Sequence, residues 1–232
     1  MILILAMDGL DLKMVEKFKC KELMQSNFGN TDISDFTMER TVVLWASFLT
    51  GKNMENKIPI KGQWKFQLKK DETFFKSFNS FKAIDVPAFS FKQKNHEKER
   101  KFLAGFFKEK NSIEDYDEVV WKNHEENKNE FFEEIGKYEI LMIYFNLADA
   151  IGHLSFGDEE KMKMVYEELN SIVRKTKKVY KETILIISDH GMKSIGRFGD
   201  HTKNGFWSLN KKINLKKPKI TDFYPLILKL KN

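Results

Sequence analysis

The sequence predicts an α/β fold built on a mostly parallel sheet. Short, mostly apolar segments rich in β-branched or aromatic residues recur along the chain, and each is followed by a polar turn. An amphipathic helix, predicted over 159–178, separates the last two of these segments, as a crossover connection between parallel strands requires. At the N-terminus, a strand pattern, a turn and a helix pattern also follow one another, which is the opening of an α/β fold.

The first predicted strand covers residues 1–7, a continuous apolar run that ends at Asp8-Gly9. Such a run is typical of a strand that is buried on both faces of a parallel sheet. Asp11 can cap the helix that follows. Further strands are expected at 82–86, 138–145 and 183–187.

Residues 91–137 interrupt this alternation of strands and helices. The segment is rich in Lys, Glu, Asn and Phe, and helical periodicity occurs at about 97–108 and 117–135. We therefore expect a small helical insertion or cap within one catalytic domain that spans residues 1–232. His96 and His124 fall in these charged stretches and are expected to be solvated surface residues.

Composition limits the partners and the location of the protein. With 41% hydrophobic and 32% charged residues, and no apolar run near the ~20 residues that span a bilayer, no membrane contact is expected. Cys20 is the single cysteine, which excludes an internal disulfide and favours a cytoplasmic location. The net charge of +6 is spread along the chain and carried mostly by Lys, which argues against a nucleic-acid partner and favours a small anionic substrate.

Carboxylates follow the ends of three predicted strands: Asp8, Asp149 and Asp189. Open α/β sheets gather ligand-binding groups at this edge. Three of the five histidines lie close to these carboxylates in the sequence: His153, His190 and His201. Carboxylate and imidazole ligands together suit zinc or manganese, so the pattern predicts a metal site.

Residues 40–52 resemble the nucleophile motif of the type I phosphodiesterase / nucleotide pyrophosphatase family of the alkaline phosphatase superfamily. Thr41 stands in the place of the nucleophile, ten residues before Gly51. Three further segments resemble family motifs: Asp8-Gly9-Leu10-Asp11, Asp85-Val86-Pro87 and Ile220-Thr221-Asp222-Phe223-Tyr224-Pro225. The motif departs from the family pattern at three positions, which bear on substrate contacts: Val43, Leu44 and Met54.

The resemblance implies an alkaline phosphatase-like α/β/α sandwich with two divalent metal ions. Zinc is expected, with manganese or iron as alternatives. One ion would be held by Asp8, Thr41, Asp189 and His190. The other would be held by Asp149, His153 and His201. Thr41, activated by a metal, would attack phosphorus and form a phosphothreonine intermediate.

The first functional hypothesis is a metal-dependent phosphohydrolase that cleaves phosphodiester or pyrophosphate bonds, with nucleotides among the candidate substrates. A phosphomonoesterase or a phosphosugar mutase of the same superfamily is the alternative, because the core ligands do not distinguish them. A sulfatase is disfavoured, since Thr41 cannot become formylglycine. From another class, the +6 charge and the Lys-rich segment 91–137 are also compatible with a non-catalytic module that binds nucleic acid or other anionic polymers.

Overall fold

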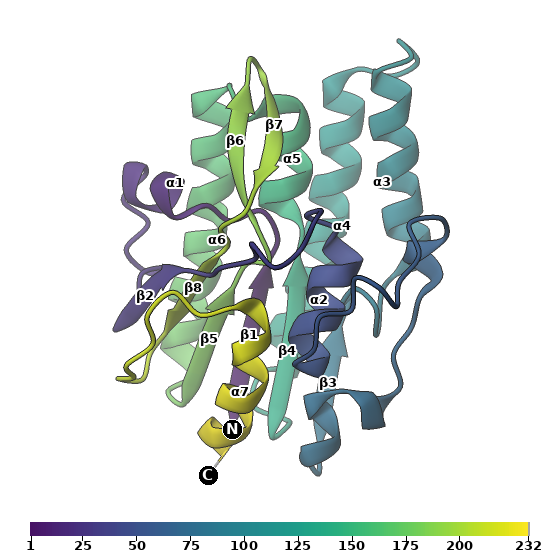
Figure 1. Cartoon of the computed structure of the whole chain (residues 1–232). Helices are drawn as coiled ribbons and strands as arrows, with labels where there is room; N and C mark the ends of the chain where they lie inside the picture. The colour runs from purple at the N-terminus through teal and green to yellow at the C-terminus, as the bar shows by residue number, and fades with distance from the viewer. Residues whose placement is uncertain (232) are drawn as a thin grey trace.

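The computed structural model describes residues 1–231 and consists of a six-stranded sheet with helices on both faces (Figure 1). The strand order is β2-β8-β5-β1-β4-β3. The bounds of these strands are β1 Ile2–Met7, β2 Asn27–Asn30, β3 Phe81–Ile84, β4 Ile140–Phe145, β5 Thr183–Ile187 and β8 Phe206–Leu209. β1, β3, β4 and β5 are parallel, whereas β8 and β2 run antiparallel at one edge. The predicted mostly parallel α/β/α sandwich is therefore confirmed.

β1 lies at the centre of the sheet, and its side chains alternate between two hydrophobic cores. Ile2, Ile4 and Ala6 pack on one face. Leu3, Leu5 and Met7 pack on the other. Burial on both faces explains why this strand is an uninterrupted apolar run in the sequence.

In residues 1–231, seven α-helices surround the sheet: α1 Leu12–Lys17, α2 Thr41–Thr50, α3 Gln93–Phe106, α4 Ile113–Glu134, α5 Leu147–Ser155, α6 Glu159–Val179 and α7 Phe223–Lys231. Short 3-10 turns cover Gln63–Lys65, Lys70–Glu72, Phe74–Ser77 and Ile220–Asp222. Asp11 caps α1 as predicted, since its side chain accepts from the amides of Lys13 and Met14. β6 Gly191–Ile195 and β7 Phe198–Thr202 form a separate hairpin that extends beyond the sheet (Figure 1).

Two helices, α3 and α4, occupy the segment in which helical periodicity was predicted. Each begins four residues earlier than its pattern indicates, and α4 starts at a capping box between Ser112 and Asp115. The prediction that His96 and His124 are solvated is wrong, because their exposed fractions are 4% and 1%. Both side chains point into the packing between these helices and β4, where carboxylates and aromatic rings contact them.

α2 carries the segment that resembles the nucleophile motif. Thr41 is the first residue of this helix, and the other nine residues are buried. The helix ends at Gly51, which adopts a left-handed φ of 68°. A Cβ at Gly51 would also lie 2.8 Å from the Tyr224 side chain, so a residue with a side chain would be strained here.

Within residues 1–231, none of the helices is long and apolar enough to cross a membrane.

Candidate active site

The predicted site residues converge at the carboxyl edge of the central strands. Asp8 directly follows β1, Asp189 follows β5 after one residue, and Asp149 lies in the first turn of α5 after β4. β1 pairs with both β4 and β5, so the ends of these strands are neighbours. His201 lies in β7 of the β6–β7 hairpin, which extends beyond this edge of the sheet.

One group of candidate ligands comprises Asp149, His153 and His201. Asp149 Oδ2 lies 3.3 Å from His153 Nε2, one helical turn further along α5. Asp149 Oδ1 lies 3.2 Å from His201 Nε2. This is the set that the family resemblance assigns to a single ion.

A second group comprises Asp8, Asp149 and His190. His190 Nε2 lies 3.2 Å from Asp8 Oδ1 and 3.8 Å from Asp149 Oδ1. Asp189 Oδ2 is 3.7 Å from the same nitrogen. The rings of His190 and His201 stack with their centroids 3.7 Å apart, so the two groups are contiguous and share Asp149.

The donor atoms at the centre of this cluster are buried and lack hydrogen-bond partners among the described residues. They are Asp8 Oδ1, Asp149 Oδ1, both oxygens of Asp189, His190 Nε2 and His201 Nε2. An unpaired buried polar atom is costly, and several that face one another fit cations well. The residues present therefore fit the divalent ions that the resemblance implies.

Both central histidines are held in the tautomer that a metal ligand needs. Nδ1–H of His190 donates to the carbonyl of Gly191 over 3.1 Å. Nδ1–H of His201 donates to the carbonyl of Glu39 over 3.1 Å. With Nδ1 protonated in this way, Nε2 is the nitrogen of each ring that would bind a metal ion after it loses its proton.

The shifted pKa values of the site residues show that the clustered carboxylates are stabilised by nearby positive charge. Burial, followed by the charges of Asp8 and Asp149, raises the pKa of Asp189 well above its ordinary value. Burial also disfavours a charged His190, but the Asp8 and Asp149 carboxylates outweigh it and raise the pKa of His190 to about 9. Burial opposes ionisation of Asp149 too, yet His153 and His201 hold its pKa well below the ordinary value. Metal ions would supply the charge that the histidines provide here.

Two aromatic side chains orient the Asp8 carboxylate. The hydroxyl of Tyr144 donates to Asp8 Oδ2 over 2.6 Å, and the indole N–H of Trp45 lies 3.4 Å from the same oxygen. Oδ1 is therefore left to face His190. Tyr144 is not among the predicted site residues; its place near the end of a buried strand was the available signal.

Thr41 lies half-buried at the wall of a cleft of about 320 Å³, which Asp149, His153 and His201 also line. The first intrahelical bond of α2 is donated by the Leu44 amide to Arg40, 2.9 Å away. The amides of residues 41–43 therefore have no acceptor within the helix. A helix N-terminus of this kind attracts anions.

The family of the chain follows from a comparison with family models. Residues 63–225 match the model described as type I phosphodiesterase / nucleotide pyrophosphatase, which is more than half of the chain. The chain belongs to this family. Five of the candidate site residues lie within the matched segment: Asp149, His153, Asp189, His190 and His201. Asp8 and Thr41 precede it.

Solved structures with a similar fold come from several branches of the alkaline phosphatase superfamily. A TAB5 alkaline phosphatase mutant is 10% identical, with a TM-score of 0.55 and coverage of 99% of this chain and 97% of that one. Murine ectonucleotide pyrophosphatase / phosphodiesterase 5 is 15% identical, with a TM-score of 0.50 over 84% of this chain and 58% of that one. The PsFucS1 sulfatase from Pseudoalteromonas sp. is 12% identical, with a TM-score of 0.50 over 99% and 67%.

These similarities show the fold of this chain. The chain spans less than two thirds of the length of the murine phosphodiesterase. No curated protein sequence matches it.

Proposed function

We propose that this protein is a metal-dependent phosphohydrolase that cleaves phosphodiester or pyrophosphate bonds, with nucleotides among its substrates. Family membership supports a phosphoester hydrolase. The observation that carries the proposal is the set of buried, unpartnered ligand atoms in Asp8, Asp149, Asp189, His190 and His201. The N-terminus of α2 with Thr41 lies at the same cleft.

Two divalent ions would occupy the cluster. Asp8, Thr41, Asp189 and His190 would hold one, and Asp149, His153 and His201 the other, with Asp149 close to both groups. When bound, such ions lower the pKa of a hydroxyl nucleophile and neutralise charge on the phosphoryl group. Zinc is the expected metal, with manganese or iron as alternatives, because carboxylate and imidazole donors accept all three.

Thr41 is the proposed nucleophile. Its Oγ1 would release its proton to solvent and form a bond to phosphorus as the bond to the leaving oxygen breaks, and that oxygen would depart with the electron pair. Water then cleaves the bond between Oγ1 and phosphorus and restores the threonine. The free amides at the start of α2 can donate to the phosphoryl oxygens, where negative charge accumulates.

A phosphomonoesterase or phosphosugar mutase would use the same ligands, so the preferred ester has to be measured. Metal-loaded protein should hydrolyse bis-p-nitrophenyl phosphate with a higher kcat/KM than p-nitrophenyl phosphate. The reverse order would favour the monoesterase, and no turnover of either ester by protein with two bound ions would overturn the proposal.

The alternative function, a non-catalytic module that binds nucleic acid or other anionic polymers, receives less support from the structure than from the sequence. Lysines on and around α4 are paired with carboxylates: Lys82 and Lys92 with Glu130, and Lys128 with Glu168. These pairs reduce the positive charge that the segment offers to a polyanion.

A cytoplasmic location stays a prediction from the single cysteine, Cys20.

A further inference from the structure

Arg100 lies on α3 and lines the same cleft as Thr41, Asp149 and His201. Its side chain is half-buried. In the described part of the chain, its guanidinium has neither an ion-pair partner nor a hydrogen-bond acceptor, although five N–H donors are available. The charges of Glu99 and Glu97 act on it without a direct contact. A partly buried guanidinium without a direct partner is unusual, because desolvation of its charge is not offset by an ion pair or a hydrogen bond.

The second arginine at the cleft, Arg40, is already committed. Its Nη1 donates to the carbonyl of Ile58 over 2.9 Å, and its Nη2 donates to the carbonyl of Glu55 over 3.2 Å. It thereby fastens the segment after α2 and has little capacity left for a substrate anion. Arg40 Nε is buried without a hydrogen-bond partner and is therefore not exposed to a substrate anion. Within residues 1–231, Arg100 is the other arginine that lines the cleft.

A stack of rings holds Arg100 in place. Its Cζ lies 4.3 Å from the centre of the Trp64 ring, a cation–π contact. Trp64 lies nearly parallel to Phe91, with ring centroids 5.9 Å apart and an interplanar angle of 16°. Phe91 in turn stacks on His96 at 4.0 Å and 9°. The guanidinium is therefore presented at the cleft by a rigid support.

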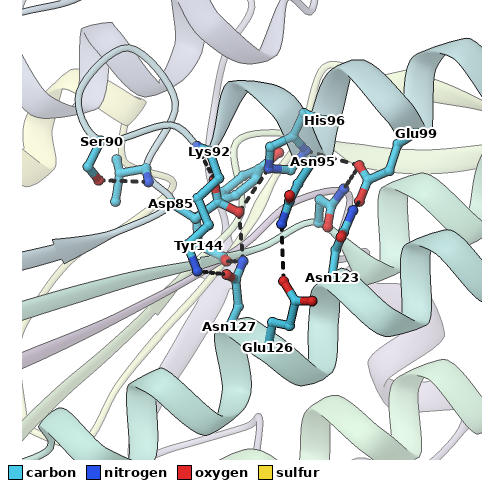
Figure 2. Close-up of polar contacts among 12 residues, drawn as sticks. Asp85, Ser90, Lys92, Asn95, His96, Glu99, Asn123, Glu126, Asn127 and Tyr144 are labelled. Carbon is cyan, nitrogen blue, oxygen red and sulfur yellow. Dashed lines mark hydrogen bonds and ion pairs between the residues drawn. The ribbon is translucent and has the colours of Figure 1, made fainter.

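The base of this stack is a buried polar network between α3 and α4 (Figure 2). His96 lies between Asp85 and Glu99, with Nε2 2.9 Å from Asp85 Oδ2 and Nδ1 3.0 Å from Glu99 Oε2. Asn123 and Asn146 each donate to Glu99 over 2.7 Å. The Glu99 carboxylate at the cleft is thus satisfied without Arg100.

Glu39, another carboxylate that lines the cleft, is paired with Lys203 at 2.9 Å. Because Glu39 and Glu99 both have their own partners, the charge on Arg100 is not cancelled by a direct contact. A planar guanidinium matches the oxygens of a carboxylate or phosphate in a bidentate geometry.

We propose that Arg100 is a specificity-determining residue that binds a second anionic group of the substrate, a carboxylate or phosphate separate from the phosphoryl group that Thr41 attacks. This inference rests on the proposed function. It makes the preferred substrate a phosphoester or pyrophosphate with an additional negative charge.

Three p-nitrophenyl phosphodiesters with the same leaving group test the assignment: the ethyl, 2-carboxyethyl and 2-phosphoethyl esters. The metal-loaded wild type should show a kcat/KM about tenfold or more higher for at least one anionic ester than for the ethyl ester. The two anionic esters distinguish carboxylate from phosphate recognition. Arg100→Gln should remove this preference, and Arg100→Lys should keep part of it because a charge remains.

Lys101→Gln is the matched control. It removes one positive charge from the next position of α3, where the side chain is exposed and does not line the cleft. It should keep the wild-type preference. Competitive inhibition gives a second measure: Arg100→Gln should weaken inhibition by pyrophosphate more than inhibition by phosphate.

Equal rates for all three esters in the wild type, or an equal loss on all three in Arg100→Gln, would overturn the role of Arg100 and leave the proposed function standing. Absence of turnover of every ester by the metal-loaded wild type would overturn both.

Discussion

Tyr144 donates a hydrogen bond of 2.6 Å to Oδ2 of Asp8, and this contact decides which oxygen of the carboxylate faces the candidate metal cluster. Burial and then the charge of Asp8 raise the pKa of Tyr144 well above its ordinary value, so the hydroxyl remains a donor. Oδ1 of Asp8 is left without a hydrogen-bond partner, 3.2 Å from His190 Nε2.

Tyr144→Phe should weaken metal binding while preserving the packing of the ring. Loss of a hydrogen bond that orients a ligand typically costs about 10- to 100-fold in metal affinity or activity. Titration of metal-free protein with zinc, together with kcat on bis-p-nitrophenyl phosphate, measures both quantities. An unchanged affinity and an unchanged kcat would show that Asp8 needs no such orientation.

Thr41→Ala should lower kcat by at least about 10³-fold, because it removes the proposed nucleophile. Thr41→Ser retains a hydroxyl at the same position and should keep part of the activity. Rapid acid quench of the wild type with a ³²P-labelled diester should trap phosphate on Thr41, which peptide mapping would locate. Full activity in Thr41→Ala would exclude this residue as the nucleophile.

Asp149→Asn should reduce the metal content more than His153→Gln does. Asp149 Oδ1 lies within 3.8 Å of His190 and 3.2 Å of His201, whereas His153 belongs to one group. Elemental analysis should find about two ions per chain in the wild type, about one in His153→Gln and close to none in Asp149→Asn. Two ions retained in Asp149→Asn would contradict the shared position of this carboxylate.

His124→Gln provides a control for that experiment. His124, Glu125 and Glu168 also form a group with metal-ligand spacing. However, Lys128 already pairs with Glu168 at 2.8 Å and with Glu125, so a cation is present there. The metal content of His124→Gln should therefore equal that of the wild type.

The protein should lose free energy of unfolding at alkaline pH, because His96 loses its proton there. Burial disfavours its charged form, but the Asp85 and Glu99 carboxylates outweigh this and raise the pKa of His96 from 6.5 to about 9. A raised pKa in the folded state contributes stability that is fully present below pH 6.5 and is lost as the pH rises through 9. The contribution is on the order of 3 kcal/mol.

Urea unfolding of the wild type and of His96→Gln at pH 6 and pH 9.5, with metal held constant, measures this effect. The wild type should be the more stable protein at pH 6, and the difference between the two should shrink at pH 9.5. Asp85 and Glu99 face the ring, and Lys92 contributes charge nearby through its contacts with Asn127 and Glu130. A difference that is constant with pH would mean that folding does not change the pKa of His96.

Local sequence patterns were sufficient wherever one periodicity dominated. The predicted strands at 1–7, 138–145 and 183–187 correspond to β1, β4 and β5, and the amphipathic stripe at 159–178 corresponds to α6. Burial on one face of a helix or both faces of a strand leaves a direct trace in the residue order. The starts of α3 and α4 were missed by four residues each: α4 begins at the Ser112–Asp115 capping box, whereas Lys92 before α3 makes no side-chain cap.

Histidines show where local reasoning fails. His96 and His124 lie among Lys and Glu residues, so their surroundings in sequence indicate solvent. Their partners in space are Asp85 and Glu168, which lie 11 and 44 residues away. Contacts at such separations are created by the packing of helices and strands, and a sequence window does not contain them.

The sequence by itself determined the α/β class, the central strands and the residues of the candidate metal cluster, because strand ends and residue types can be read along the chain. The tertiary structure alone decided that Asp149 lies within reach of both ligand groups, that Tyr144 orients Asp8, and that Arg100 stands unpaired on Trp64. Each of these relationships joins side chains from different elements. Their distances depend on how the helices and the sheet pack together, which no local periodicity records.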